Sequence, residues 1–151
     1  MRMAHSPPYV LLPLTPETAG FGELLAESER GGFGMLERLR AEWVNGTNRF
    51  ERRGEILVGA FEDERLIGAG GRNVDPFAVD PRTGRVRHLY VAQAFRKTGI
   101  GRMLMDRILT DAGIYFRRLN VRAPAAAFGF YEHLGFERVE GSDTVSHMLM
   151  L

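Results

Sequence analysis

The stretch Arg96-Lys97-Thr98-Gly99-Ile100-Gly101 lies between a strand-like segment at residues 86–91 and a helix-like segment that it opens. A loop in this setting leaves several backbone N–H groups without a partner in the chain, because the first turn of a helix has no preceding carbonyl groups to bind them. Glycine lacks a Cβ atom, so a ligand can approach the backbone closely. This combination is typical of a phosphate-binding loop, and we expect a pyrophosphate to bind here.

The charge near this loop also favours an anionic ligand. Between residues 82 and 107 the only acidic residue is Asp106, and the basic residues are Arg82, Arg85, Arg87, Arg96, Lys97, Arg102 and Arg107. The whole chain has a net charge of only +1, so most of its positive excess is concentrated here. That modest net charge argues against a dedicated nucleic-acid-binding protein.

Other phosphate-binding motifs fit the loop less well. A dinucleotide-binding fingerprint needs a third glycine where position 104 is Leu, and a Walker loop needs a Gly-Lys-Ser/Thr sequence that the chain lacks. An ordinary strand-to-helix turn, which uses glycine only for its shape, remains the alternative to a binding loop.

Length and composition limit the function classes. The chain has 151 residues, which predicts a single domain over residues 1–151. It contains no cysteine, and this excludes a disulfide framework, a thiolate zinc site and a cysteine acyl-enzyme. Residues 1–5 lack the apolar core of a signal peptide, and no apolar run reaches the roughly twenty residues of a membrane span. We therefore expect a soluble, cytoplasmic protein with no membrane partner.

The first half of the chain predicts strands and amphipathic helices. Residues 9–12 indicate a first strand, and Thr15 followed by Pro16 indicates the start of a helix. One helix then carries Leu24, Leu25 and Ser28 and breaks at Gly31-Gly32, and a second carries Met35, Leu36, Leu39 and Trp43 and ends at Asn45-Gly46. Residues 56–61 and 66–71 flank a charged turn and predict a β-hairpin.

The second half predicts alternating strands and helices. We expect a strand at 86–91, a helix with the apolar stripe Ile100, Met103, Leu104 and Ile108 that stops at Gly113, a strand at 116–121, a short helix from Pro124 to Gly135, and strands at 136–139 and 144–150. The sum is an α/β (α+β) fold with a single mixed, mostly antiparallel sheet of about six to seven strands flanked by about four helices.

Three motifs in the last half of the chain together resemble the GNAT superfamily of N-acetyltransferases. The acyl-CoA loop of that family has Arg or Gln, two residues, Gly, one residue and then Gly or Ala, and here Arg96, Gly99 and Gly101 fill this pattern. Leu89-Tyr90-Val91 precedes the loop and Phe130-Tyr131-Glu132-His133-Leu134-Gly135-Phe136 follows it, in the order that the family has. The resemblance implies a GNAT-like fold, acetyl-CoA as co-substrate and no metal.

The resemblance also implies which residues bind acetyl-CoA. The pyrophosphate would bind the amides of the loop, and nearby charge would come from the basic side chains; these residues are Arg96, Lys97, Thr98, Gly99, Ile100, Gly101 and Arg102. The backbone of Leu89, Tyr90 and Val91 would pair with pantetheine as an added strand, and the N–H group of Val91 or its neighbour would bind the acetyl oxygen. A buried central strand is the plainer interpretation of 89–91, and it is compatible with this role.

A catalytic role for Tyr131 follows from the same resemblance. In the family, the tyrosine of this motif lies beside the sulfur of CoA and donates a proton to the departing thiolate. The chemistry is reasonable because a phenol with a pKa near 10 can share its proton with a thiolate whose thiol has a pKa near 8.5. A core tyrosine on an amphipathic helix is the alternative.

The general base has no motif of its own. An alkyl amine with a pKa of about 10.4 is almost fully protonated at pH 7, so some group has to accept a proton. Many family members use a glutamate on the strand that enters the CoA segment, but here that stretch is Arg85-Val86-Arg87-His88. His88 is the nearest candidate, although a lone strand histidine is more often structural. Asp75, Glu51 and His147 are weaker options.

Two features concern the substrates. Many relatives carry an asparagine where Pro124 lies here, so Asn120 either binds the pantetheine arm from the adjacent strand or simply ends a strand. We expect the acceptor between the N-terminal helices and the loop at residues 73–80. Its pocket could be walled by Phe33, Leu36 and Trp43, although core packing is their more ordinary role.

These observations predict an acetyl-CoA-dependent N-acetyltransferase that acts on a primary amine of a small molecule or peptide by direct attack in a ternary complex. The lack of cysteine favours direct attack over a route through an enzyme thioester. A non-catalytic acyl-CoA-binding sensor is the alternative, since the strand carboxylate is missing, and an RNA-associated acetyltransferase is a third reading. We expect acetyl-CoA and the amine as partners, allow for a homodimer, and expect no nucleic acid.

Overall fold

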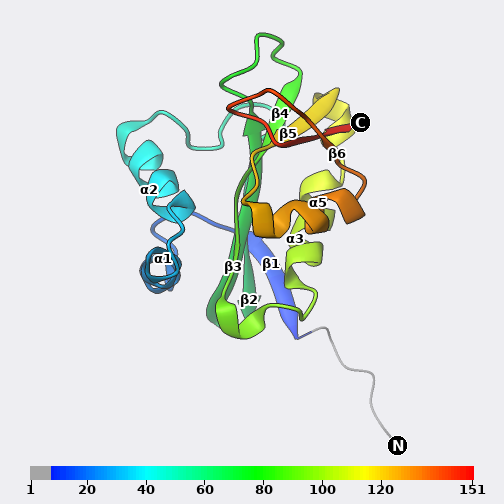
Figure 1. Ribbon diagram of the computed structural model, residues 1–151. Helices are drawn as coiled ribbons and strands as arrows, with labels where there is room; N and C mark the ends of the chain where they lie inside the picture. The colour runs from blue at the N-terminus through cyan, green and yellow to red at the C-terminus, as the bar shows by residue number, and fades with distance from the viewer. Residues whose placement is uncertain (1–7) are drawn as a thin grey trace, which may run out of the picture.

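The computed structural model describes residues 8–151, which form a seven-stranded sheet with helices on both faces (Figure 1). The strands are β1 (Tyr9–Pro13), β2 (Ile56–Glu62), β3 (Arg65–Val74), β4 (Thr83–Val91), β5 (Arg118–Val121), β6 (Glu137–Arg138) and β7 (His147–Met150). They lie in the order β1-β2-β3-β4-β5-β7-β6. Strands β4 and β5 pair in parallel, and the other neighbours are antiparallel, so the predicted mixed, mostly antiparallel sheet is confirmed.

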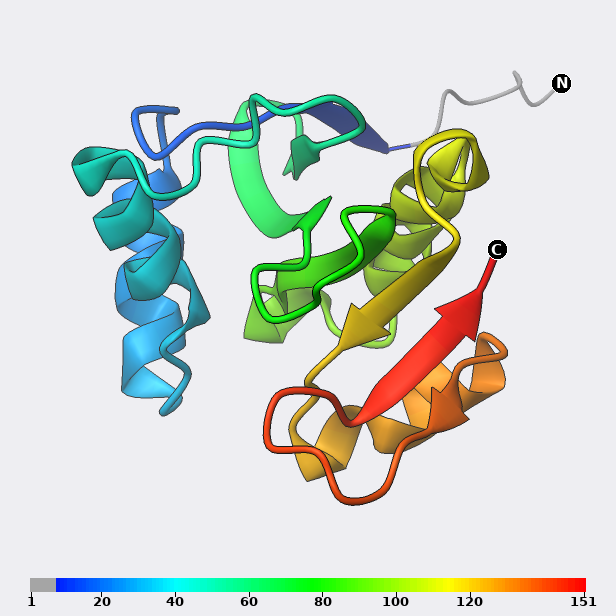
Figure 2. The same cartoon turned by 90° about the horizontal axis from the view of Figure 1, so that it is seen from above.

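Two layers of helix cover the sheet. The helices are α1 (Phe21–Arg30), α2 (Met35–Asn45), α3 (Ile100–Leu109), the single turn α4 (Ala112–Tyr115) and α5 (Phe128–His133). Helices α1 and α2 lie on one side of the sheet, and α3 and α5 lie on the other (Figures 1 and 2). Short 3-10 turns at Gln93–Phe95 and Ala125–Ala127 come before α3 and α5.

Apolar stripes at helical spacing hold these layers against the sheet. Helix α1 buries Phe21, Leu24 and Leu25, and α3 buries Ile100, Leu104, Met105 and Ile108. Burial of one such side chain contributes roughly 1.5–3 kcal/mol relative to leaving it exposed. Packing on both faces therefore fixes β3 and β4 in the centre of the molecule, where the candidate site lies.

The first helix begins later than its sequence suggests. Thr15 and Pro16 do not start α1, which begins at Phe21 after Gly20 in a left-handed conformation with φ 92°. The hydroxyl of Thr15 accepts the N–H group of Glu17 at 3.1 Å, and the hydroxyl of Thr18 accepts the N–H group of Thr15 at 3.0 Å. These hydroxyl groups cap a turn instead of a helix, as serine and threonine often do.

Helix α3 ends before the predicted stop at Gly113, which lies inside α4. The reason is Arg72 of β3, which is 1% exposed and donates to the carbonyl groups of Ile108 at 2.8 Å and Thr110 at 2.9 Å. Its guanidinium also lies 2.8 Å from the carboxylate of Asp111. A buried cation thus satisfies the last carbonyl groups of the helix, which otherwise need a capping partner.

Other boundaries differ by a few residues from the predicted ones. Strand β4 begins at Thr83, before the expected 86–91, because its first residues pair with β5. Strands β6 and β7 are shorter than the predicted 136–139 and 144–150, since the hydroxyl of Ser142 accepts the N–H groups of Thr144 and Val145 and turns the chain between them. Pro124 precedes a 3-10 turn, and α5 itself begins at Phe128.

The sequence also predicted that the chain has no signal peptide and no membrane span. Residues 1–5, on which the argument against a signal peptide rests, lie outside the described residues. Within residues 8–151, every helix is too short or too polar to cross a membrane.

Candidate functional site

A cleft opens where β4 and β5 separate. Their parallel pairing runs from Thr83 opposite Arg118 to Arg85 opposite Asn120 and stops there. Beyond it, residues 86–91 of β4 pair with β3 alone among the described residues, so their other edge has no strand partner. The cleft has a volume of about 640 Å³ and is lined along this edge by Leu89, Tyr90 and Val91. An open strand edge of this kind can accept an extended ligand.

A β-bulge shapes the middle of β4. The register with β3 shifts between Ala69 and Gly71, so that His88 and Leu89 together oppose Gly70. His88 has φ 60°, in the left-handed region that side chains rarely adopt. Such an extra residue turns successive side chains toward the same face. Arg87 accordingly contacts Glu42 of α2 at 2.9 Å, and the His88 ring lies 5.9 Å from that of Phe50.

The glycine loop is built as a phosphate-binding loop would be. The backbone N–H groups of residues 97–102 donate to no described residue. Lys97 and Gly99 both have positive φ, 66° and 91°, and an added Cβ atom at Gly99 would have no atom within 4 Å. The hydroxyl of Thr98 donates to the carbonyl group of Phe95, which holds the turn closed. The loop therefore offers unpaired donors at the start of α3 and open space in front of them.

The predicted cationic side chains of this loop face different ways. Arg96 bends back along β4: its Nε donates to the carbonyl group of Val91 at 3.1 Å, and its guanidinium lies 5.4 Å from the Tyr90 ring. It lines the cleft. Arg102 is exposed on α3 and pairs with Asp106 at 3.1 Å. Ile100 is buried in the core, so it contributes its backbone alone.

Tyr90 is anchored on the α1 side of the sheet. Its hydroxyl donates to Glu27 of α1 at 2.5 Å, and its ring lies 5.9 Å from Phe33. Burial and this hydrogen bond raise the pKa of Tyr90 to about 12. The sequence did not indicate this contact, because Glu27 lies 63 residues away in the chain.

Tyr131 lies on α5 at the opposite wall of the cleft. It is 4% exposed and packs edge-on against Phe130 and Phe136, with ring centroids 5.2 and 5.3 Å away. Its hydroxyl makes no hydrogen bond with the described residues, and burial raises the pKa of Tyr131 above its usual range. A buried phenol that keeps its proton and lines a cleft can donate that proton to a ligand.

His88 is also buried and lines the same cleft. Its Nε2 atom has no hydrogen-bond partner among the described residues. Burial, and to a smaller extent the nearby charges of Arg87 and Arg38, lower the pKa of His88 to about 3. The imidazole is therefore neutral at pH 7.

Asn120 lies away from the other predicted binding residues. Its side-chain amide donates to Asp75 at 2.8 Å, and the guanidinium of Arg85 lies 3.5 Å from the same carboxylate oxygen. All three side chains are buried. Asp75 is thus held in an internal network, and Glu51 is exposed at a separate pocket beside the end of α2.

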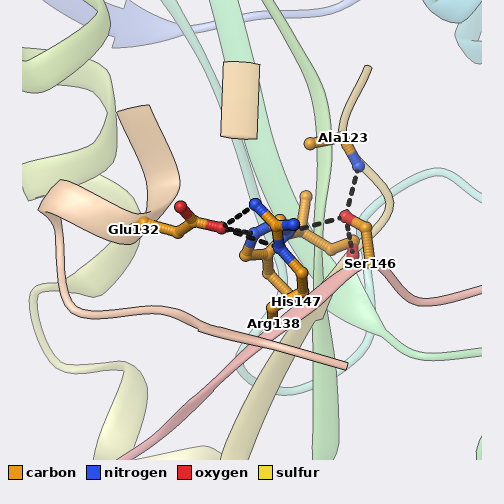
Figure 3. Close-up of polar contacts among 6 residues, drawn as sticks. Ala123, Glu132, Arg138, Ser146 and His147 are labelled. Atoms are coloured by element: carbon orange, nitrogen blue, oxygen red, sulfur yellow. Dashed lines mark hydrogen bonds and ion pairs between the residues drawn. The ribbon is translucent and has the colours of Figure 1, made fainter. Parts of the chain in front are cut away.

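His147 belongs to another network, which joins β7 to α5 (Figure 3). Its Nε2 atom lies 2.7 Å from Glu132 and its Nδ1 atom lies 2.9 Å from the hydroxyl of Ser146. That hydroxyl accepts the N–H group of Ala123, which lines the cleft, and Glu132 also pairs with Arg138 at 2.9 Å. Nothing in the sequence pattern marks these residues as neighbours. Within residues 8–151, no group of three or more His, Asp or Glu side chains is placed to hold a metal ion.

The expected acceptor pocket matches only part of the cleft wall. The cleft does reach from Phe33 and α2 to Pro76 and Phe77 of the 73–80 loop. Leu36, however, is fully buried in the core, and Trp43 packs against that core without lining the cleft. Their core role is the one that the structure supports.

Comparison with known proteins identifies related sequences and folds. The model of the Acetyltransferase (GNAT) domain matches residues 18–150. A protein from Exiguobacterium sp. 255-15, whose description proposes an acetyltransferase, is 28% identical over 94% of this chain and 93% of its own, with a TM-score of 0.83. An acetyltransferase from Streptococcus agalactiae (17% identity, 95% and 99% coverage, TM-score 0.71) and the ribosomal-protein-alanine N-acetyltransferase of Brucella melitensis (20%, 94% and 99%, 0.69) share the fold. No curated protein matches the chain.

Proposed function

Since this chain belongs to the GNAT family of acetyltransferases, we propose that it transfers an acetyl group from acetyl-CoA to a primary amine of a small molecule or peptide. The observation that carries the proposal is the cleft between the free edge of β4, at residues 86–91, and Tyr131, with Arg96 of the glycine loop in its lining. The unpaired N–H groups of residues 97–102 follow Arg96 directly in the chain.

The residues present fit acetyl-CoA. The loop amides would bind the pyrophosphate, with Lys97 and Arg102 nearby, because free N–H groups at a helix N-terminus attract anions. The free edge of β4 would pair with the amide groups of the pantetheine arm, as an added strand does. An N–H group of Val91 or its neighbour would donate to the acetyl oxygen as negative charge develops on it.

Acetyl-CoA supplies an activated acetyl thioester. Residues of the chain would transfer the protons and hold the two substrates in place. Tyr131 would donate its phenolic proton to the departing sulfur, and His88 would accept a proton from the attacking amine. Water molecules would then carry a proton from His88 to Tyr131, and both side chains would return to their starting states. For this role the pKa of His88 has to rise when the acceptor binds, since it is about 3 without one. Direct attack agrees with the absence of cysteine from the chain.

Two measurements test this function. Thermal melts with and without acetyl-CoA report binding, because a ligand at 100 times its dissociation constant stabilises the folded state by about 2.7 kcal/mol. Release of CoA with a panel of amines reports turnover, and a thiol reagent has no background reaction with a chain that contains no cysteine. Binding without turnover of any amine would instead support a non-catalytic sensor. No melting shift at saturating acetyl-CoA would remove the proposal.

A further inference from the structure

The end of the cleft farthest from the glycine loop is rich in arginine. Its charged lining consists of Arg38 and Glu42 of α2, Arg85 and Arg87 of β4, and Arg122 just after β5. These side chains come from three separate elements and meet in one region. Their mutual proximity is also visible in the pKa values, since Arg87 and Arg122 both act to lower the pKa of Arg85, after the larger effect of its burial.

Part of this positive charge has no counter-charge in the protein. Arg87 pairs with Glu42 at 2.9 Å, and Arg85 lies 3.5 Å from Asp75. Arg38 and Arg122 form no ion pair with a described residue. Arg85 itself is only 6% exposed: its Nη2 atom donates to the carbonyl group of Thr144 at 2.5 Å, and its Nη1 atom is the one that faces Asp75. Arg38 and Arg122 therefore leave a surplus of positive charge on the cleft wall, which favours an anionic ligand there.

This cationic region is separate from the loop that would bind the phosphates of CoA. Arg85 lies in the first part of β4, whereas the glycine loop follows the other end of this strand, after Val91. The bulge turns Arg87 toward α2, and Arg87 directly precedes His88, the proposed proton acceptor. An anion held here would therefore belong to the acceptor and not to the pyrophosphate.

We propose that the acceptor is a small amine that also carries a carboxylate or phosphate group, which binds among Arg38, Arg85 and Arg122 while the amine lies near His88. This inference rests on the proposed acetyltransferase activity and names its substrate class. Arginine suits the role because its planar guanidinium donates paired hydrogen bonds to either anion. An anion beside Arg38 and Arg87 would also offset the charges that disfavour a proton on His88.

A matched panel of amines tests the inference. CoA release at saturating acetyl-CoA is followed with β-alanine, phosphoethanolamine, ethanolamine and ethylenediamine, which are similar in length and differ in charge. We expect kcat/KM for at least one of the two anionic amines to exceed that of ethanolamine by tenfold or more, and ethylenediamine to be the poorest acceptor. The better of β-alanine and phosphoethanolamine then identifies the anion.

Equal rates with ethanolamine, or no turnover of either anionic amine while acetyl-CoA raises the melting temperature, would overturn the inference. Absence of acetyl-CoA binding would instead defeat the proposed function itself.

Exposed arginines allow a test that leaves the fold intact. Arg38→Gln and Arg122→Gln should each raise KM for the preferred anionic amine by about tenfold, with little change in the KM of acetyl-CoA. Arg40→Gln is the matched control, because Arg40 is exposed on the same helix, pairs with Glu37 and does not line the cleft. If Arg38→Gln and Arg122→Gln behave like Arg40→Gln, the anion does not bind here.

Discussion

The Nε2 atom of His147 lies 2.7 Å from the carboxylate of Glu132, the residue that directly follows Tyr131 in α5. His147 is fully buried in β7, so this contact ties the short helix to the sheet. Through Ser146 the same network reaches the N–H group of Ala123, on the cleft wall (Figure 3). A six-residue helix has little stability of its own, and side-chain contacts of this kind hold it in place.

Loss of this contact should destabilise the protein. His147→Leu puts an apolar side chain of similar size in place of the imidazole and removes the partner of Glu132 and Ser146, so we expect the free energy of unfolding to fall by about 1–3 kcal/mol. Arg138→Gln is the control, because Arg138 binds the same carboxylate from a position that is 51% exposed and should matter by less than about 1 kcal/mol. Urea denaturation of both variants gives the two values. Equal losses would mean that the buried histidine does not anchor α5.

The pH dependence of stability should report the burial of His88. Its pKa is about 3 in the folded protein against an ordinary value of 6.5, so below pH 6.5 the unfolded chain binds a proton that the folded protein does not. Stability therefore falls as the pH decreases from 6.5 toward 3, by up to about 1.4 kcal/mol per pH unit. His88→Asn removes this dependence and tolerates the positive φ, because asparagine adopts left-handed conformations more readily than most residues.

Urea denaturation at a series of pH values between 7 and 5 compares the wild-type protein with His88→Asn. The wild-type protein should lose more stability on acidification, with a difference of up to about 2 kcal/mol at pH 5. Parallel losses in the two proteins would mean that His88 takes up a proton normally in the folded state.

Local patterns in the sequence predicted most of the fold. The β2–β3 hairpin, the strand before the glycine loop and the stripe of α3 follow from periodicity and turn residues, which act over a few positions. The end of α3 did not follow, because Arg72, which binds its last carbonyl groups, lies 36 residues from Ile108. The left-handed conformation at His88 had no signal either, since neither it nor its immediate neighbours is glycine.

The candidate site was predictable only where a motif marked it. The loop at residues 96–101 and Tyr131 were predicted from the spacing of their motifs, and the structure places Arg96 and Tyr131 at one cleft. The arginine cluster combines Arg38, Arg85 and Arg122, which meet only after the sheet has formed. Such contacts between distant residues could not be predicted, because the sequence does not show which charged residues come together in the fold.

Substitution of Gly101 should separate binding from folding. An added Cβ atom would lie 3.6 Å from Phe130 and 3.8 Å from Val91, which are ordinary contacts, so Gly101→Ala should fold and bind acetyl-CoA. Gly101→Glu would extend a negative charge into the space in front of the loop amides and should abolish binding while the fold persists. Calorimetric titration with acetyl-CoA, together with melting curves of both variants, measures the effect. Near-normal affinity of Gly101→Glu would place the phosphates elsewhere.

Removal of the Tyr131 hydroxyl should affect turnover far more than stability. Because that hydroxyl makes no hydrogen bond with the described residues, Tyr131→Phe leaves no buried partner unpaired and should change the free energy of unfolding by less than about 1 kcal/mol. Loss of a proton donor should lower kcat on the order of a hundredfold, with acetyl-CoA affinity nearly unchanged.

Since burial raises the pKa of Tyr131, the phenol keeps its proton at alkaline pH, and the wild-type rate should not fall near the ordinary phenol pKa of about 10. Steady-state kinetics against pH with the amine found by the panel test both points. Wild-type turnover in Tyr131→Phe would make Tyr131 a packing residue and assign protonation of the sulfur to water.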